Sequence, residues 1–192
     1  MEKVKVGIIG AGGLANSVHY PSLAEFSDVE ISAICDLDAN RLKSTAEKFK
    51  IEKTYSDYKK MIQEADLNAI YIIMPPHHLF DLAIHCLNSK LNVFIEKPPG
   101  VTAEQTRNMA ITAEKNGCLS MVGFNRRFIP LLVEAKKLVL ERSEMLQCVA
   151  TFYKNSIGAG PYYAGAIDIL TCDAVHAVDS LRWMGGEPVS VA

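Results

Sequence analysis

The sequence lacks any long, uninterrupted apolar run. None of its hydrophobic stretches approaches the roughly 18 residues that a membrane-spanning helix needs. The N-terminal MEKVKVGIIG leads directly into a β-branched run, so we do not expect it to be a secretory signal peptide. These absences predict a cytoplasmic protein with no membrane segment.

Charge of one sign is also scarce. Lys and Arg together number 20 and Asp and Glu 22, which gives a formal net charge of −2. Nucleic-acid binding needs a basic field that this balance does not supply, so we expect no nucleic-acid partner. Apolar residues make up 49% of the chain and charged residues 22%, which is typical of a globular protein rather than a disordered one.

The sequence has no CxxC motif. Its five cysteines are far apart, odd in number and set in apolar stretches, at Cys35, Cys86, Cys118, Cys148 and Cys172. This pattern argues against a zinc site or a dithiol redox centre. We expect buried, reduced thiols and no metal.

What the sequence does have is a regular alternation of short apolar runs and amphipathic stretches up to residue 124. Strands are expected at 4–9, 29–35, 53–55, 67–74, 92–95 and 118–122. Helices are expected between them, at 14–26 with a bend at Pro21, 38–49 capped by Asp38, 56–64 capped by Ser56, 78–89, and 102–116 capped by Thr102 and ended by Gly117. The inner face of the first of these helices is expected to carry Leu14, Val18, Leu23 and Phe26. This order predicts an α/β fold with a doubly wound parallel sheet of Rossmann type.

The pattern changes after Gly123. Residues 129–142 and 166–184 are apolar at helical spacing, whereas 144–153 alternates in part and predicts a strand. The tail 187–192 resembles the start of another strand. We therefore expect two domains, 1–124 and 125–192, of which the second is an incomplete α/β domain.

A glycine-rich loop joins the first strand to the first helix. It has the form GxGxxA and runs Gly10-Ala11-Gly12-Gly13-Leu14-Ala15. The first glycine permits a tight turn, the second lets a pyrophosphate approach the backbone, and the helix N-terminus offers N–H groups to phosphate. Glycine-rich turns are common, so the loop alone is weak evidence. The predicted dinucleotide contacts here are Gly10, Gly12, Gly13 and Leu14.

Asp36 ends the second predicted strand and strengthens that interpretation. A carboxylate there can accept hydrogen bonds from the ribose hydroxyls of a dinucleotide and repels a 2′-phosphate, which favours NAD over NADP. Arg41 is near enough in sequence to reach a 2′-phosphate, so NADP stays an alternative. Asp36 could instead merely begin a turn.

Glu96-Lys97-Pro98 follows the strand 92–95, at the edge of the sheet where ligands bind in open α/β folds. A lysine there can act as proton donor or acceptor if its neighbours lower its pKa, and Glu96 could orient it or pair with it. The alternative is an ordinary exposed loop lysine. Pro75, which ends the strand before, completes the predicted cofactor contacts together with Glu96 and Lys97.

Two motifs beyond residue 122 carry further candidates. Arg127, in GFNRRF, could bind substrate oxyanions or hold the domain junction. On a helix, Cys172, His176 and Asp179 share one face, and Asp173 lies one turn from His176. We expect His176 and Asp173 as an acid–base pair, and Arg127 and Asp179 at the substrate, although a lone helical histidine is more often structural.

Taken together, these motifs resemble the Gfo/Idh/MocA family of NAD(P)-dependent oxidoreductases. The matching segments, in family order, are VGIIGAGGLA, AIYIIMPP, VFIEKPPGVT, MVGFNRRFIP and HAVDSLRWMGGEPV. The resemblance implies a Rossmann domain followed by a second domain built on an open antiparallel sheet. It also implies that Lys97 lies near the nicotinamide and the reacting hydroxyl, and that His176 serves as acid or base. The implied reaction is hydride transfer between NAD(P) and a hydroxyl-bearing carbon of a sugar or polyol.

The sequence departs from this family in three places. Many members carry an Asp four residues before the histidine, where this chain has Cys172, and the nearest acid is Asp173. The motif after the proline pair usually ends in a histidine, whereas here His77 and His78 come early. The chain is also short for the family, so we expect a truncated substrate and oligomerisation domain whose exposed edges could form a homo-oligomer.

Two functions therefore compete. The first is a dehydrogenase, or the N-terminal part of one, that acts on a small sugar or polyol. The second is a catalytically weak or inactive dinucleotide-binding protein, such as a truncated relative, a sensor or a partner. Methyl transfer from S-adenosylmethionine would share the glycine loop but would leave Glu96-Lys97-Pro98 unexplained.

Overall fold

The computed structural model describes residues 2–155, 157–158 and 160–187. The chain divides into two compact units, residues 1–122 and 123–192. In the described residues, strands occur only in the first unit, and no helix is long and apolar enough to cross a membrane.

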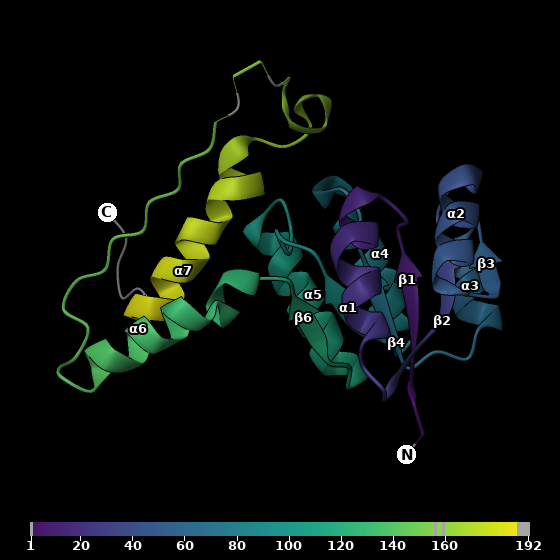
Figure 1. The fold of residues 1–192 in the computed structure, drawn as a ribbon, viewed down its shortest axis with the longest axis horizontal. Helices are drawn as coiled ribbons and strands as arrows, with labels where there is room; N and C mark the ends of the chain where they lie inside the picture. The colour runs from purple at the N-terminus through teal and green to yellow at the C-terminus, as the bar shows by residue number, and fades with distance from the viewer. Residues whose placement is uncertain (1, 156, 159, 188–192) are drawn as a thin grey trace. The chain divides into compact units, whose positions relative to one another are not determined.

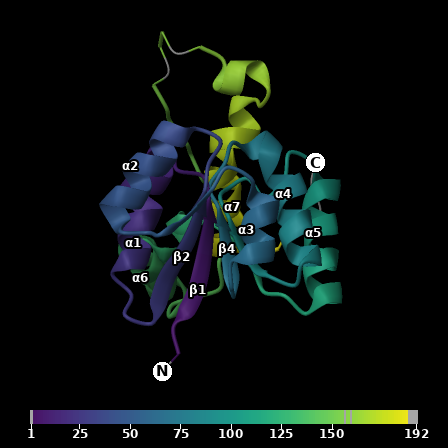
Figure 2. The ribbon, with the colours of Figure 1, turned by 90° about the vertical axis from the view of Figure 1, so that its right-hand side faces the viewer.

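The first unit is built on a six-stranded sheet. Its strands are β1 (Val4–Ile9), β2 (Val29–Cys35), β3 (Lys53–Tyr55), β4 (Ala69–Ile72), β5 (Asn92–Ile95) and β6 (Ser120–Val122). All neighbouring pairs are parallel, in the order β3-β2-β1-β4-β5-β6. Figure 2 shows the central strands β2, β1 and β4 side by side. This order confirms the predicted doubly wound sheet. From β1 the chain first adds strands on one side, β2 and β3, and then on the other, β4 to β6, so the strand order reverses between β1 and β4.

Helices cover both faces of this sheet, and each face has its own core. The helices are η1 (Ala15–His19), α1 (Tyr20–Ala24), α2 (Ala39–Phe49), α3 (Tyr58–Glu64), α4 (Pro76–Asn88) and α5 (Ala103–Asn116). In Figure 2, α1 and α2 lie on one side of the strands and α3, α4 and α5 on the other. Tyr20 and Leu23 pack with the α2 side chains in one core, and Met61, Leu79 and Met109 pack in the other. Strand side chains such as Ile8 and Ile72 are fully buried because both faces are covered.

Most predicted helix ends are confirmed at the level of individual hydrogen bonds. The Asp38 carboxylate accepts from the backbone N–H groups of Asn40 and Arg41, and Thr102 Oγ1 accepts from Gln105 N. The prediction that Ser56 caps α3 is wrong. Asp57 is the extended residue before that helix, and its carboxylate accepts from Lys59 N.

The predicted inner face of the first helix is confirmed at Leu23 and is wrong elsewhere. Leu14, Val18 and Phe26 are exposed, and Ala15 and Tyr20 are buried in their place. The cause is a π turn, in which Tyr20 N–H donates to the carbonyl of Ala15, five residues back. Such a turn holds one residue more than an α turn, so the spacing of 3.6 residues fails across it.

The second unit consists of helices and loops over its described residues. It contains η2 (Asn125–Phe128), α6 (Pro130–Leu140), η3 (Tyr162–Gly165), η4 (Leu170–Ala174) and α7 (Val175–Gly185). The predicted strand 144–153 does not form; that stretch runs without a strand partner (Figure 1). A strand needs a neighbour for its backbone hydrogen bonds, and the described part of this unit offers none. The tail predicted as a strand, 188–192, lies outside the described residues.

None of the five cysteines, which all lie in the described part, forms a disulfide. Burial raises the pKa of the Cys35 thiol to about 11 and that of Cys86 to about 12. Both groups are therefore protonated at neutral pH and act as small core side chains.

The two-sided core predicts a contrast between two leucines. Leu79→Ala should lower the free energy of unfolding by about 2–5 kcal/mol, because the side chain is fully buried against the sheet. Leu37→Ala should change it by less than about 0.5 kcal/mol, because Leu37 is 85% exposed. Urea unfolding followed by circular dichroism measures both, and equal effects would contradict this description of the core.

Candidate functional site

The glycine loop lies at the reversal point of the sheet, directly after β1. Gly10 has a φ of +111°, and a Cβ on it would lie 2.3 Å from the carbonyl oxygen of Ile73, so the fold itself requires glycine there. At Gly12 and Gly13 a Cβ would meet nothing within 4 Å. These two glycines border open space, as expected where a phosphate approaches the backbone.

Three polar side chains hold this loop. Asp36 Oδ2 accepts from Ala11 N at 2.7 Å, and Asn16 Nδ2 donates to the Ala11 carbonyl at 2.9 Å. Asn16 also donates to Thr45 Oγ1 at 2.9 Å, and Thr45 is buried on α2. Sequence reasoning missed Asn16 and Thr45, because nothing in the sequence joins two polar residues that lie 29 positions apart.

The Asp36 side chain connects the glycine loop to the turn that follows β2. Besides Ala11 N, its carboxylate accepts from Asp38 N at 2.8 Å, and its side chain is 9% exposed. Arg41 Nη2 lies 3.9 Å from Asp36 Oδ1, while Arg41 Nε lies 3.1 Å from Asp38 Oδ2. Asp36, which favours NAD, and Arg41, which could bind the 2′-phosphate of NADP, are therefore neighbours.

Glu96 follows β5 and binds two partners. Its Oε1 lies 2.8 Å from His19 Nε2, and its Oε2 accepts from the backbone N of Lys97 at 3.2 Å. The predicted orienting contact to Lys97 thus runs through the Lys97 backbone. His19, which the sequence motifs did not point to, is the main side-chain partner of Glu96.

Pro75 precedes α4, and the histidine pair begins that helix. The His77 and His78 rings lie 4.1 Å apart between centroids. Partial desolvation, and then the neighbouring His78, lower the pKa of His77. A neutral imidazole is therefore favoured at this end of β4 at neutral pH.

In the second unit, Asp173 is held by two side chains that the sequence did not indicate. Lys154 Nζ and Tyr162 OH both donate to Asp173 Oδ2. The hydrogen bond to Asp173 raises the pKa of Lys154, so this lysine stays charged. Asp173 and Cys172 are both buried in η4, directly before the helix that carries His176.

The two substrate candidates pair with each other. Arg127 Nε donates to Asp179 Oδ2 at 2.9 Å, and Arg127 Nη2 donates to Asp179 Oδ1. Asp179 is only 6% exposed, and its hydrogen bond raises the pKa of Arg127. This forked pair ties η2 to α7 inside the second unit.

The predicted residues therefore fall into two sets. Within the first unit, the ends of parallel strands bring one set to the same edge of the sheet: Gly10, Gly12, Gly13, Leu14, Asp36, Pro75, Glu96 and Lys97. The second unit holds the other set: Arg127, Asp173, His176 and Asp179. Among the described residues, no group of three or more His, Cys, Asp or Glu side chains could hold a metal ion.

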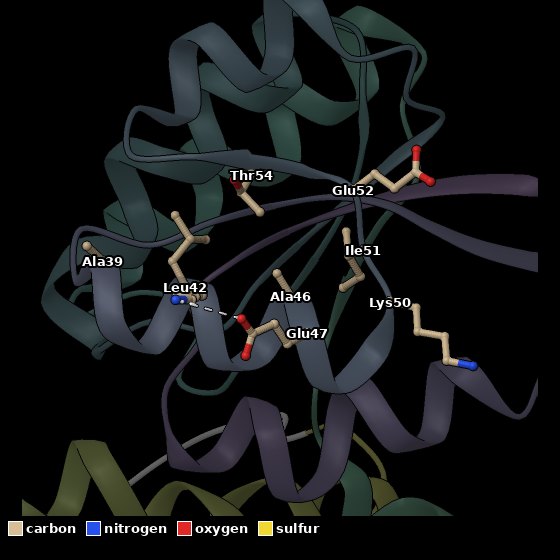
Figure 3. A pocket seen from close by; sticks show the side chains of 9 residues that line it. Ala39, Leu42, Ala46, Glu47, Lys50, Ile51, Glu52 and Thr54 are labelled. Atoms are coloured by element: carbon tan, nitrogen blue, oxygen red, sulfur yellow. Dashed lines mark ion pairs between the residues drawn. The ribbon is translucent and has the colours of Figure 1, made fainter.

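A hollow of about 510 Å³ lies elsewhere on the first unit. It is lined by one side of α2 and by the residues that follow this helix, namely Lys50, Ile51, Glu52 and Thr54 (Figure 3). Its charged rim includes the Lys43–Glu47 ion pair at 3.9 Å. None of its lining residues belongs to the predicted site.

Comparison with known proteins gives curated relatives. The chain is 32% identical to the uncharacterized oxidoreductase YrbE of Bacillus subtilis over 138 residues, which cover 72% of this chain and 40% of that protein. It is 30% identical to inositol 2-dehydrogenase of Salmonella typhimurium over 188 residues, or 96% of this chain and 55% of that protein. The chain thus spans about half the length of the curated relatives it matches.

Solved structures of dehydrogenases are similar to this chain as well. Myo-inositol 2-dehydrogenase from Lactobacillus plantarum matches with a TM-score of 0.69 and 32% identity over 73% of this chain and 42% of that one. Scyllo-inositol dehydrogenase from Lactobacillus casei, with bound NAD(H) and scyllo-inositol, matches in fold with a TM-score of 0.83 and 22% identity, covering 95% of this chain and 56% of that one. Residues 4–124 match the family described as "Oxidoreductase family, NAD-binding Rossmann fold". With its glycine loop at the reversal point of a parallel sheet, the chain belongs to the Gfo/Idh/MocA family of oxidoreductases.

Proposed function

We propose that this chain binds NAD(H) and belongs to an enzyme that transfers a hydride to or from a hydroxyl-bearing carbon of a sugar or polyol. The observation that carries the proposal is the contrast within the glycine loop. Gly10 is required by the fold, whereas Gly12 and Gly13 border open space that nothing in the first unit fills. The relatives support the substrate class, since the Salmonella relative is named an inositol 2-dehydrogenase.

The residues of the first unit fit a dinucleotide. The N–H groups around Gly12 and Gly13 would hold the pyrophosphate, and Asp36 would accept from the ribose hydroxyls. We propose NAD as the preferred form because Asp36 would repel a 2′-phosphate, although Arg41 beside it gives NADP a cation to bind. Leu14 and Pro75 would border the cofactor on either side of the loop.

The chain's own chemical task is to orient the alcohol and move its proton. When bound, the nicotinamide supplies the hydride acceptor or donor. We propose that Lys97, at the end of β5, lies near the reacting hydroxyl, where its ammonium donates a proton when a carbonyl is reduced and its neutral amine accepts the hydroxyl proton when the alcohol is oxidised. His176 and Asp173 are proposed as the acid–base pair of the second unit, with Arg127 and Asp179 near the substrate.

We extend the proposal to the two predicted domains. Residues 1–124 would bind the dinucleotide, and 125–192 would begin a substrate and oligomerisation domain whose exposed edges could join two copies of the chain. We also propose a cytoplasmic location, because the five cysteines are free and free thiols persist in a reducing compartment.

A specific observation favours a second candidate, a catalytically weak dinucleotide-binding protein. The position four residues before His176 is Cys172, and the adjacent acid, Asp173, already accepts from Lys154 and Tyr162. This carboxylate is thus engaged by two donors other than His176. Reduction of NAD by a panel of polyols separates the two candidates, because tight NADH binding without any turnover would select the second.

Substitution of the loop glycines tests cofactor binding. Gly12→Ala should weaken NADH binding about tenfold or more, because a methyl group blocks a charge-assisted hydrogen bond to the pyrophosphate. It should leave the melting temperature unchanged, because the new Cβ meets no protein atom. Gly10→Ala should lower the melting temperature instead, because its Cβ collides with the Ile73 carbonyl. NADH affinity that survives Gly12→Ala would overturn the loop assignment.

Cofactor choice tests Asp36. Asp36→Ala should remove the preference for NAD over NADP, because the charge that repels the 2′-phosphate is gone. The ratio of the two dissociation constants measures this effect. Asp66→Ala is the control, since it removes an exposed carboxylate that pairs with Lys5 and contacts neither Asp36 nor Arg41, and it should keep the ratio. An unchanged ratio in Asp36→Ala would show that a group other than Asp36 recognises the adenosine ribose.

Turnover tests Lys97. Lys97→Ala should lower kcat about 100-fold or more while NADH binding stays within about twofold, because the proton donor is lost but the loop is intact. Lys60→Ala, on the exposed side of α3, is the control and should match the wild type. Full turnover by Lys97→Ala with an oxidisable polyol would remove Lys97 from the reaction.

A further inference from the structure

The π turn after the glycine loop carries a residue that the proposed function does not use. His19 is the last residue of η1 (Ala15–His19), and its side chain is only 11% exposed. Its ring packs against Phe94 of β5, with centroids 5.5 Å apart, and faces the edge of Tyr71 at 6.2 Å. Single π turns inside helices are frequent at functional sites. The π turn η1, which follows the glycine loop, thus places the His19 ring next to the end of β5.

The contact that His19 makes there connects two parts of the candidate site. Its Nε2 lies 2.8 Å from Glu96 Oε1, and the other carboxylate oxygen accepts from the backbone N of Lys97 at 3.2 Å. The backbone N of Glu96 in turn donates to the Ile72 carbonyl at the end of β4. One partly buried carboxylate thus joins the helix of the glycine loop to the turn that carries Lys97.

The geometry fixes which half of a dinucleotide depends on this link. In a doubly wound sheet the cofactor crosses the reversal point, with one nucleotide on each side. Asp36, the ribose candidate, lies on the β2 side, so the adenosine half belongs over β1, β2 and β3. The nicotinamide half then belongs over β4, β5 and β6, where Glu96 and Lys97 are.

We propose that His19 is a positioning residue for the nicotinamide half of the site and acts through Glu96. The imidazole donates to the Glu96 carboxylate and fixes it, and the carboxylate fixes the backbone of Lys97. This proposal rests on the proposed function, because it assumes that a dinucleotide binds at the loop. It predicts that the loss of His19 harms recognition of nicotinamide and spares recognition of adenosine.

The experiment compares two ligands on the wild type and four variants. NADH carries both halves of the dinucleotide, whereas ADP-ribose lacks the nicotinamide, and calorimetry gives both dissociation constants. His19→Leu removes the hydrogen-bond donor, His19→Gln keeps an N–H donor near the position of Nε2, and Glu96→Gln removes the carboxylate charge. His85→Leu is the matched control, because His85 lies in the last turn of α4, at the opposite end of that helix from Pro75.

We expect His19→Leu and Glu96→Gln to lose about tenfold in NADH affinity, since each removes a charge-assisted hydrogen bond, while ADP-ribose affinity stays within about twofold. His19→Gln and His85→Leu should resemble the wild type for both ligands. Retained ADP-ribose binding also shows that each variant is folded. If His19→Leu does not fold, Glu96→Gln against His19→Gln gives the same comparison.

The outcomes separate this inference from the proposed function. If neither ligand binds the wild type, the proposed function fails. If both ligands bind the wild type but the variants lose both equally, or lose neither, His19 does not position the nicotinamide half and the inference is overturned. Failure of His19→Gln to rescue binding would likewise show that the hydrogen bond to Glu96 is not what matters.

Discussion

The close approach of three chain segments at Gly10 is the constraint on which the rest of the site depends. Gly10 N donates to the Cys35 carbonyl at the end of β2, and Tyr20 OH donates to the Gly10 carbonyl. The Ile73 carbonyl lies where a Cβ would be. Only a glycine with a positive φ fits between these segments, so β1 must end here and its loop must open at the reversal point of the sheet.

Buried polar pairs then set the geometry around that loop. Asp36 holds Ala11, Asn16 joins the loop to Thr45 on α2, and Glu96 joins the loop helix to the end of β5. A buried carboxylate is costly without partners, and the Asp36 and Glu96 carboxylates each have two. The loop is therefore organised by the protein itself, which reduces the ordering that a bound dinucleotide would have to supply.

The sequence predicted what depends on local periodicity and local chemistry. Parallel strands, the Asp38 and Thr102 caps and the Gly117 helix end, with its φ of +66°, all follow from residues a few positions apart. It could not predict pairs such as His19 with Glu96, whose partners are 77 positions apart and meet only through sheet order. The strand expected at 144–153 failed for a related reason, because alternation shows a preference but not a partner.

Two π turns explain why the buried face of a helix could not be predicted from a constant spacing of 3.6 residues. The turn before Tyr20 exposes Leu14 and Val18, and a second π turn, η4, precedes His176, where Val175 N–H donates to the Leu170 carbonyl. In an uninterrupted α-helix, Asp173 and Asp179 would lie about 120° apart around the axis. Both are buried, each against its own cation, Lys154 and Arg127. A face drawn through Cys172, His176 and Asp179 at constant helical spacing therefore overlooks the change of pitch at η4.

The proposed residues belong to two units, and this makes cofactor binding and turnover separable properties. Every group proposed to hold the dinucleotide lies in the first unit, and contacts such as Asp36 with Ala11 and His19 with Glu96 are made within it. In the second unit, Asp173 pairs with Lys154 and Asp179 pairs with Arg127, so these candidates are engaged within that unit. Loss of proton transfer in the second unit would therefore leave the dinucleotide contacts intact. A family member that binds its cofactor tightly but turns over slowly is the expected intermediate between the two candidate functions.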